Sequence, residues 1–203
     1  MKIVKADEEG LQYAASVIRG GGIAIYPTET VYGLGCAPSD PDATKKILQI
    51  KERAEKPLPL ICSSIEFARR IVKFNATAEK LAERFWPGPL MMILPNRVDY
   101  PIWVTHGKKT LGIRVPGSDV ARKLAELSAG VIVSTSANKS GAAPPQTAKE
   151  AIDQIGHKVD VVVDDGPSPG QLPSTIIDLS GSEIWIERSG PITGTMIMDV
   201  LRV

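Results

Sequence analysis

Residues 8–26, EEGLQYAASVIRGGGIAIY, show the pattern of an amphipathic helix followed at once by a short apolar strand. The apolar residues of one helical face recur at the i, i+3, i+4, i+7 spacing, namely Leu11, Ala14, Ala15 and Ile18. Gly20–Gly22 end this helix, and the apolar run Ile23–Tyr26 follows directly. The spacing predicts a helix over 8–19 and a strand over 23–26.

Similar patterns continue along the chain. A second helix is predicted to begin at the N-cap Asp40, followed by Pro41, and to run to about Arg53. Another is predicted after a capping box formed by Ser63 and Glu66. Further helices are predicted over 78–85, 120–127 and 147–155, and the last of them begins with a capping box formed by Thr147 and Glu150. Further strands are predicted over 58–62, 90–94, 111–115, 131–134, 159–163, 175–179 and 184–187. We therefore expect one domain over residues 1–203, of the α+β class, with a large twisted mixed β-sheet flanked by helices in three layers.

Composition limits the class of protein. Hydrophobic residues make up 43% of the 203 residues and charged residues 23%, which is typical of a globular chain and argues against disorder. A net charge of +1 does not mark the whole chain as a binder of nucleic acid or membrane. The spacing of Cys36 and Cys62 fits neither a disulfide framework nor a metal cage, so both are expected to be buried thiols. No signal peptide or membrane span is recognisable, and a cytoplasmic location is expected.

Two polar loops follow predicted strands. The first, Tyr26–Gly35, combines hydroxyls, a carboxylate and glycines, and is read equally well as a ligand-binding loop or as a polar turn. In the second, Ser134, Ser136 and Asn138 project to one side of an extended chain and suit hydrogen bonds to a ligand. A turn rich in Ser and Asn is the simpler explanation of the second loop taken alone.

Cationic residues indicate an anion site. Lys51 and Arg53 follow a helix, where positive side chains also favour the helix dipole, but three further lysines nearby, Lys45, Lys46 and Lys56, favour a bound anion such as a triphosphate. Arg114 lies inside an apolar strand, and its charge must face solvent, a partner or a ligand. Arg188 raises the same question more weakly.

Several familiar mechanisms have no matching motif. The sequence has no phosphate-binding P-loop, dinucleotide fingerprint or G-x-S-x-G elbow, and neither His106 nor His157 has metal-ligand spacing. Residues 164–166, Asp-Asp-Gly, could hold magnesium, although a turn is the commoner meaning. No metal-binding residue is predicted.

Taken together, the motifs resemble the YrdC-like threonylcarbamoyl-AMP synthase family. The matching stretches, in order, are PTETVYGLG (27–35), KER (51–53), WPGP (86–89), GIRVP (112–116), STSANKSG (134–141) and PSTIID (173–178). The resemblance implies the YrdC-like fold and a nucleotidyltransferase that makes threonylcarbamoyl-AMP and pyrophosphate from L-threonine, bicarbonate or carbon dioxide, and ATP. The product would serve the N6-threonylcarbamoyladenosine modification of tRNA, through downstream threonylcarbamoyl-transferase proteins.

The resemblance also implies roles for individual residues. Catalytic roles fall on Lys51, Arg53, Ser136 and Asn138. Contacts to threonine are implied for Thr30, Arg114, Ser134 and Ser174. Contacts to ATP are implied for Arg53, Thr110, Ser136 and Arg188. Mg2+ is expected to enter with ATP, without a dedicated protein cage.

One departure and two alternatives remain. Some family members use a histidine near threonine shortly after the Pro-Leu that follows Lys-x-Arg, whereas Pro57–Cys62 here contains none.

A non-catalytic module that binds double-stranded RNA or tRNA is the first alternative, with phosphate contacts from Lys45, Lys46, Arg69, Arg70, Lys73, Lys108 and Lys109. Only 5% of residues are aromatic, which leaves few platforms for base stacking. The related carbamoyl-transfer enzyme of hydrogenase maturation is the second.

Overall fold

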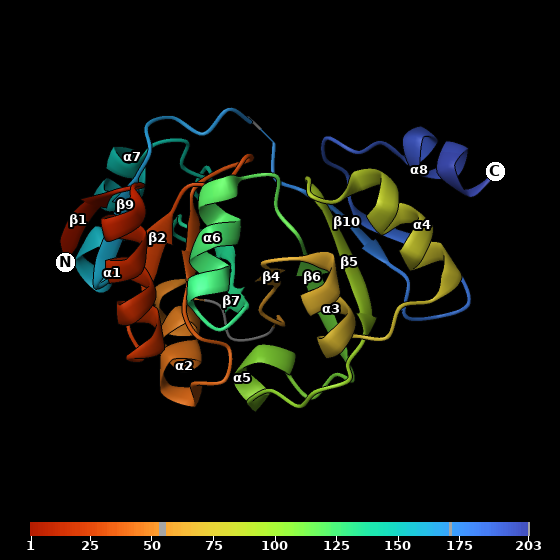
Figure 1. Cartoon of the computed structure of the whole chain (residues 1–203), viewed down its shortest axis with the longest axis horizontal. Coiled ribbons are helices and arrows are strands. Elements are labelled where there is room, and N and C mark those ends of the chain that lie inside the picture. Colours follow the sequence, from red (N-terminus) through yellow and green to blue (C-terminus); the bar gives the residue numbers. More distant parts are fainter. Residues whose placement is uncertain (53–55, 171, 203) are drawn as a thin grey trace.

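The computed structural model describes residues 1–52, 56–170 and 172–202, and its strands form two mixed sheets (Figure 1). The first sheet has the order β1-β9-β2-β3-β8, with strands β1 (Lys2–Lys5), β9 (Val161–Asp164), β2 (Ala24–Tyr26), β3 (Gly33–Gly35) and β8 (Thr135–Ser136). The second has the order β11-β10-β5-β6-β4-β7, with strands β11 (Trp185–Arg188), β10 (Thr175–Asp178), β5 (Leu90–Pro95), β6 (Thr110–Arg114), β4 (Leu60–Cys62) and β7 (Val131–Val133).

Helices cover the sheets from two sides. They are α1 (Glu8–Arg19), α2 (Pro41–Ile50), α3 (Ile65–Ile71), α4 (Ala76–Phe85), α5 (Ile102–Thr105), α6 (Asp119–Leu127), α7 (Ala148–Ile155) and α8 (Gly194–Leu201). The helices α1 and α6 lie side by side (Figure 1), and their apolar faces pack in one cluster with β2, β9, β4 and β7. The other helices contribute to a larger cluster on the opposite face of the strands.

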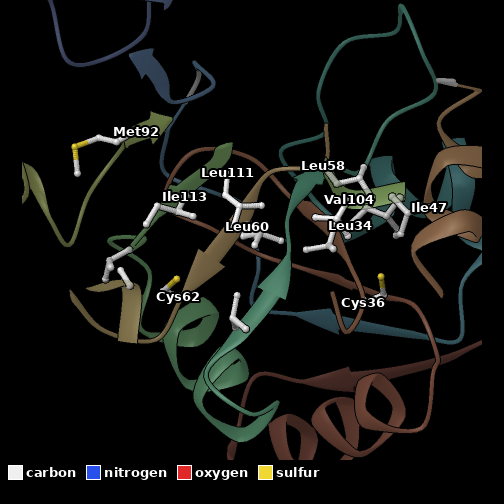
Figure 2. Packing of buried hydrophobic residues seen from close by; sticks show 14 of the residues in the cluster. Leu34, Cys36, Ile47, Leu58, Leu60, Cys62, Met92, Val104, Leu111 and Ile113 are labelled. Carbon is white, nitrogen blue, oxygen red and sulfur yellow. The ribbon is translucent and has the colours of Figure 1, made fainter. Parts of the chain in front are cut away.

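Alternation along single strands separates the two clusters. Leu60 belongs to the larger cluster and its neighbour Ile61 to the cluster under α1 and α6, because successive side chains of a strand point to opposite faces. Figure 2 shows Leu60 close to Leu111 and Ile113 in the larger cluster. Helices, strands and helices thus form the three expected layers, although the strands divide into two sheets where one large sheet was predicted.

One part of the strand layer has no helix over it. Arg114 pairs with Ile61 across β6 and β4 and therefore faces the side of α1 and α6. Among the described residues, however, none from β5, β6, β10 or β11 belongs to the cluster under those two helices. This uncovered face of the second sheet is where a cavity forms.

The local predictions hold with two corrections. Asp40 and Thr147 cap α2 and α7 as expected. The residue that caps α3 is Ser64, whose Oγ accepts from Phe67 N, because the backbone of Ser63 is engaged in a hydrogen bond to Gly130 O. The stretch Tyr26–Gly35, predicted as a loop after a strand, ends in a second strand, β3, antiparallel to β2.

Both cysteines are free and buried in the larger cluster, as predicted (Figure 2). Burial raises the pKa of the Cys62 thiol to about 12 and raises the pKa of the Cys36 thiol as well. Neither thiol is therefore ionised at neutral pH, which makes both poor nucleophiles.

Within the part of the chain that the structure describes, no helix has the length and hydrophobicity to cross a membrane.

Gly35 gives a test of how closely the two sheets approach. A Cβ added there would lie 2.2 Å from Val133 O and 3.0 Å from a ring carbon of Tyr26. We expect Gly35→Ala to lower the free energy of unfolding by about 1–3 kcal/mol, measured from the urea midpoint, because β3 must move away from β7. Gly181→Ala is the matched control, since nothing lies within 4 Å of its added Cβ. An unchanged midpoint for Gly35→Ala would contradict this packing.

Candidate active site

A cavity of about 580 Å3 lies between the first sheet and the uncovered face of the second. The first sheet and its loops contribute Thr28, Thr30, Val31, Gly33, Thr135 and Ser136. The second contributes alternate residues of three strands, namely Met91 and Ile93 of β5, Thr110, Gly112 and Arg114 of β6, and Ile176 and Asp178 of β10. The cavity therefore brings together segments that are far apart in the sequence.

Arg114 is the most buried cation of the cavity wall, with 4% of its surface exposed. Its Nη1 donates to Glu29 Oε1 at 3.0 Å and to Ser174 Oγ at 2.6 Å. Within the described chain, Arg114 Nε and Glu29 Oε2 are buried without a hydrogen-bond partner. Unsatisfied buried polar atoms are rare in folded proteins, and here one of the two belongs to Arg114, which lines the cavity, whereas Glu29 is not among the described lining residues.

The loop before β3 presents hydroxyl groups to this end of the cavity. Thr28 Oγ1 and Thr30 Oγ1 are 2.9 Å apart, and Thr28 Oγ1 donates to Val31 O at 2.7 Å. Both threonines are buried, and both line the cavity. Since Ser134 and Ser174 line it as well, the four residues predicted to contact threonine, namely Thr30, Arg114, Ser134 and Ser174, share one cavity.

Lys51 lies behind the cavity wall. This residue caps the C-terminus of α2, and its buried Nζ donates to Ser136 O at 2.7 Å, to Asn138 O at 2.6 Å and to Asn138 Oδ1 at 3.0 Å. Asn138 Nδ2 in turn donates to Lys139 O and Ala142 O. Ser136 lines the cavity, whereas neither Lys51 nor Asn138 is among its lining residues. In this structure the lysine holds the backbone that presents Ser136.

The cavity wall also carries other predicted ATP contacts. Thr110 and Arg188 both line it, and Arg188 Nε donates to Ser174 O at 2.9 Å. Of the described lining residues, four are cationic and two are acidic: Lys56, Lys108, Arg114 and Arg188, then Asp178 and Glu187. The excess of positive charge suits an anionic ligand. Arg53, predicted both as catalytic and as an ATP contact, lies outside the described residues.

Tyrosines beneath the site remain protonated. Burial is the main reason why the pKa values of both Tyr26 and Tyr32 are raised, that of Tyr32 to about 12. The hydroxyl of Tyr26 donates to Val133 O. Tyr32 Oη donates to Gly166 O at 2.6 Å, and Gly166 N donates to Asp164 Oδ1, so residues 164–166 form a turn.

Across the described ranges, no three His, Cys, Asp or Glu side chains gather as a metal site.

Comparison with known proteins settles the family. The family model for Sua5, YciO and YrdC proteins, described as "Telomere recombination", matches residues 16–190. The chain belongs to the Sua5/YciO/YrdC family. Its mixed two-sheet architecture is the YrdC-like fold, as the sequence motifs predicted.

Relatives in this family include enzymes of different lengths. A threonylcarbamoyl-AMP synthase of Halorhodospira halophila is 35% identical over 164 residues, which cover 80% of this chain and 83% of the relative. That of Pyrococcus abyssi is 38% identical over 178 residues, which cover 87% of this chain and 52% of the relative. The crystal structure of P. abyssi Sua5 complexed with L-threonine has a TM-score of 0.92 and 35% identity, and the match covers 98% of this chain and 59% of that chain. This family member thus spans about half the length of the P. abyssi protein.

Sequence reasoning missed some residues of the site. Glu29 was visible only as a carboxylate in a polar loop, and its pairing with Arg114 joins positions 85 residues apart. The charge of Arg114 within an apolar strand indicated that it needs a counter-ion if it is buried, but the sequence did not indicate which residue is that counter-ion. Lys56 and Lys108 also line the cavity, although Lys108 was assigned only to a possible RNA surface.

Proposed function

We propose that this chain is a threonylcarbamoyl-AMP synthase, which converts L-threonine, bicarbonate or carbon dioxide, and ATP into threonylcarbamoyl-AMP and pyrophosphate. The observation that carries the proposal is the buried Arg114, held by Glu29 and Ser174 in a cavity whose other cations suit a polyphosphate. The names of the relatives in H. halophila and P. abyssi support the same activity.

Threonine fits the end of the cavity at Arg114. The guanidinium of Arg114 lines the cavity and can donate to the amino-acid carboxylate, and a charged hydrogen bond of this kind is among the strong ones in proteins. Thr30, Ser134 and Ser174 supply hydroxyls around it. ATP would occupy the remaining part, near Ser136, Thr110 and Arg188, with Arg53 as a further predicted contact.

The proposed reaction requires positioning more than a protein nucleophile. The amine of threonine and carbon dioxide form a carbamate, whose oxygen attacks the α-phosphorus of ATP as pyrophosphate leaves. The protein must hold two anions together and offset the charge that develops, which arginine and lysine side chains do well. Mg2+ would enter bound to the phosphates of ATP, since the described residues that line the cavity include only two carboxylates, Asp178 and Glu187.

The product implies partners beyond the substrates. We expect threonylcarbamoyl-AMP to pass to threonylcarbamoyl-transferase proteins that modify tRNA, in the cytoplasm. Direct RNA binding receives less support from the surface, because Arg69 pairs with Glu79 at 2.7 Å and Arg70 lies over the ring of Phe67.

A single incubation tests the activity. The protein is mixed with ATP, Mg2+, bicarbonate and labelled threonine, and pyrophosphate and a threonine-bearing adenylate are measured without RNA. We expect both products, and neither when threonine or bicarbonate is left out. Absence of both products, together with salt-sensitive RNA binding, would favour the non-catalytic alternative.

A further inference from the structure

Trp185 is a large apolar side chain exposed beside the candidate active site. It begins the edge strand β11, and 68% of its surface is accessible. The other two tryptophans are better covered: Trp86 is buried with its Nε1 donating to Leu90 O, and Trp103 lies near Lys45, whose Nζ is 5.6 Å from the ring centroid. Ile184 and Ile186, which flank Trp185 in the chain, are 39% and 40% exposed, so the indole belongs to an exposed apolar segment and is not an isolated surface residue.

Strand register places the Trp185 side chain on the cavity side of the sheet. Trp185 pairs with Asp178, Asp178 with Ile93, and Ile93 with Gly112, so one row of residues crosses four strands. Residues directly opposite one another point to the same face of a sheet. The other three members of this row line the cavity.

The next residue of β11 confirms this orientation. Ile186 pairs with Ile177, which belongs to the larger core cluster on the opposite face. A Cβ added at Gly194 of α8 would lie 3.3 Å from Ile186 Cδ1. Because neighbouring residues of a strand alternate in direction, Ile186 faces α8 and Trp185 faces the cavity side.

Next to Asp178, which lies directly opposite Trp185, the floor of the cavity is apolar and partly exposed. Ile93 and Ile176 lie on adjacent strands and both line the cavity, and Gly112 adds only backbone. Ile176 lies on β10, next to β11, and Ile93 lies on β5, the strand after it. Because neighbouring strands are about 4.8 Å apart, a planar ring that rests over these two residues is within reach of an indole on β11. A flat apolar floor next to an indole suits a nucleobase, since stacking on aromatic side chains is favourable.

We propose that Trp185 binds the adenine ring of ATP by stacking, over the floor formed by Ile93 and Ile176. The inference rests on the proposed function, because it assigns one part of the ATP substrate. Arg188 lies three residues further along the same strand, and a register shift after Ile186 pairs it with Ile176 and places it on the cavity side, about 7 Å along the sheet from Trp185. A nucleotide lying along β11 thus has its base at Trp185 and its phosphates towards Arg188.

The test compares ATP with a ligand that has no base. Binding of ATP and of inorganic tripolyphosphate is measured by calorimetry for the wild type, Trp185→Ala and Trp185→Phe, and tryptophan fluorescence is recorded during the ATP titration. We expect Trp185→Ala to weaken ATP binding roughly tenfold while tripolyphosphate binding changes less than about twofold, because only the stacking contact is lost. Trp185→Phe should keep most of the ATP affinity.

Trp103→Phe is the matched control. It removes a partly exposed tryptophan on α5 that lies near Lys45 of α2 and not on β11, so ATP should still quench the fluorescence of this variant. The quenching should disappear in Trp185→Ala.

Three outcomes would overturn the assignment. Equal weakening of ATP and tripolyphosphate, or no change in either, would overturn it while leaving the proposed function in place. Concentration-dependent dimerisation lost in Trp185→Ala, with ATP affinity unchanged, would assign the indole to contact between two copies instead. A wild-type protein that binds no ATP would overturn the proposed function as well.

Discussion

Arg114→Met should abolish threonine-dependent pyrophosphate release and lower the free energy of unfolding by about 3–5 kcal/mol. The loss of activity follows from removing the guanidinium that we place against the threonine carboxylate. The loss of stability has a different cause, because the carboxylate of Glu29 would remain in a largely buried position without its cation. Calorimetry with threonine and urea denaturation measure the two effects separately.

A double variant separates these two effects. In Glu29→Gln/Arg114→Met the uncompensated charge is gone, so the urea midpoint should return most of the way to that of the wild type. Threonine binding should still be absent, because the guanidinium that we place against the threonine carboxylate is missing. Threonine-dependent turnover restored in the double variant would show that Arg114 acts only as the counter-ion of Glu29.

Lys51→Met should destabilise the fold by about 3 kcal/mol and reduce kcat/KM for ATP about 100-fold. Methionine keeps the aliphatic stem, but the carbonyls of Ser136 and Asn138 lose a charged donor in a buried place. Small displacements of a residue that positions a substrate cost about this much in rate. Thermal denaturation and steady-state kinetics measure the two changes.

Lys46→Met is the control for Lys51→Met. It removes a lysine from the same helix, α2, but from its exposed side, and should change the free energy of unfolding by less than about 0.5 kcal/mol. Similar losses of activity in both variants would indicate a general effect of charge and not the brace at Ser136.

Amphipathic helices and buried apolar strands were predictable from the sequence, whereas elements that are very short, mostly exposed or without a clear polar face were not. The helix over 8–19 and the strand that ends at Tyr26 occur almost as predicted, since one face of the helix and both faces of the strand are buried. The helix α5 has only four residues, and α8, with the sequence GTMIMDVL, lacks a clear polar face. The strand β1 is mostly exposed, which hides the apolar pattern of a strand.

The site could be predicted as a set of residues but not as a set of contacts. An arginine within the apolar strand at 111–115 had to face solvent, a partner or a ligand, and Arg114 has the partner Glu29. The sequence placed Lys51 near an anion, whereas its ammonium group contacts carbonyl oxygens of the Ser136–Asn138 segment. That arrangement depends on how the end of α2 meets β8, which no local pattern of residues encodes.

The contacts that build the cavity also affect the rate at which the chain folds. Hydrogen bonds from Arg114 to Glu29 and to Ser174 span 85 and 60 positions of the chain, and that from Lys51 to Asn138 Oδ1 spans 87. Contacts of such long sequence separation form late and slow folding down, because the loops between them must close first. Substrate binding should therefore appear only in the last phase of refolding. Bound threonine or ATP would in turn stabilise the complete chain rather than any fragment of it.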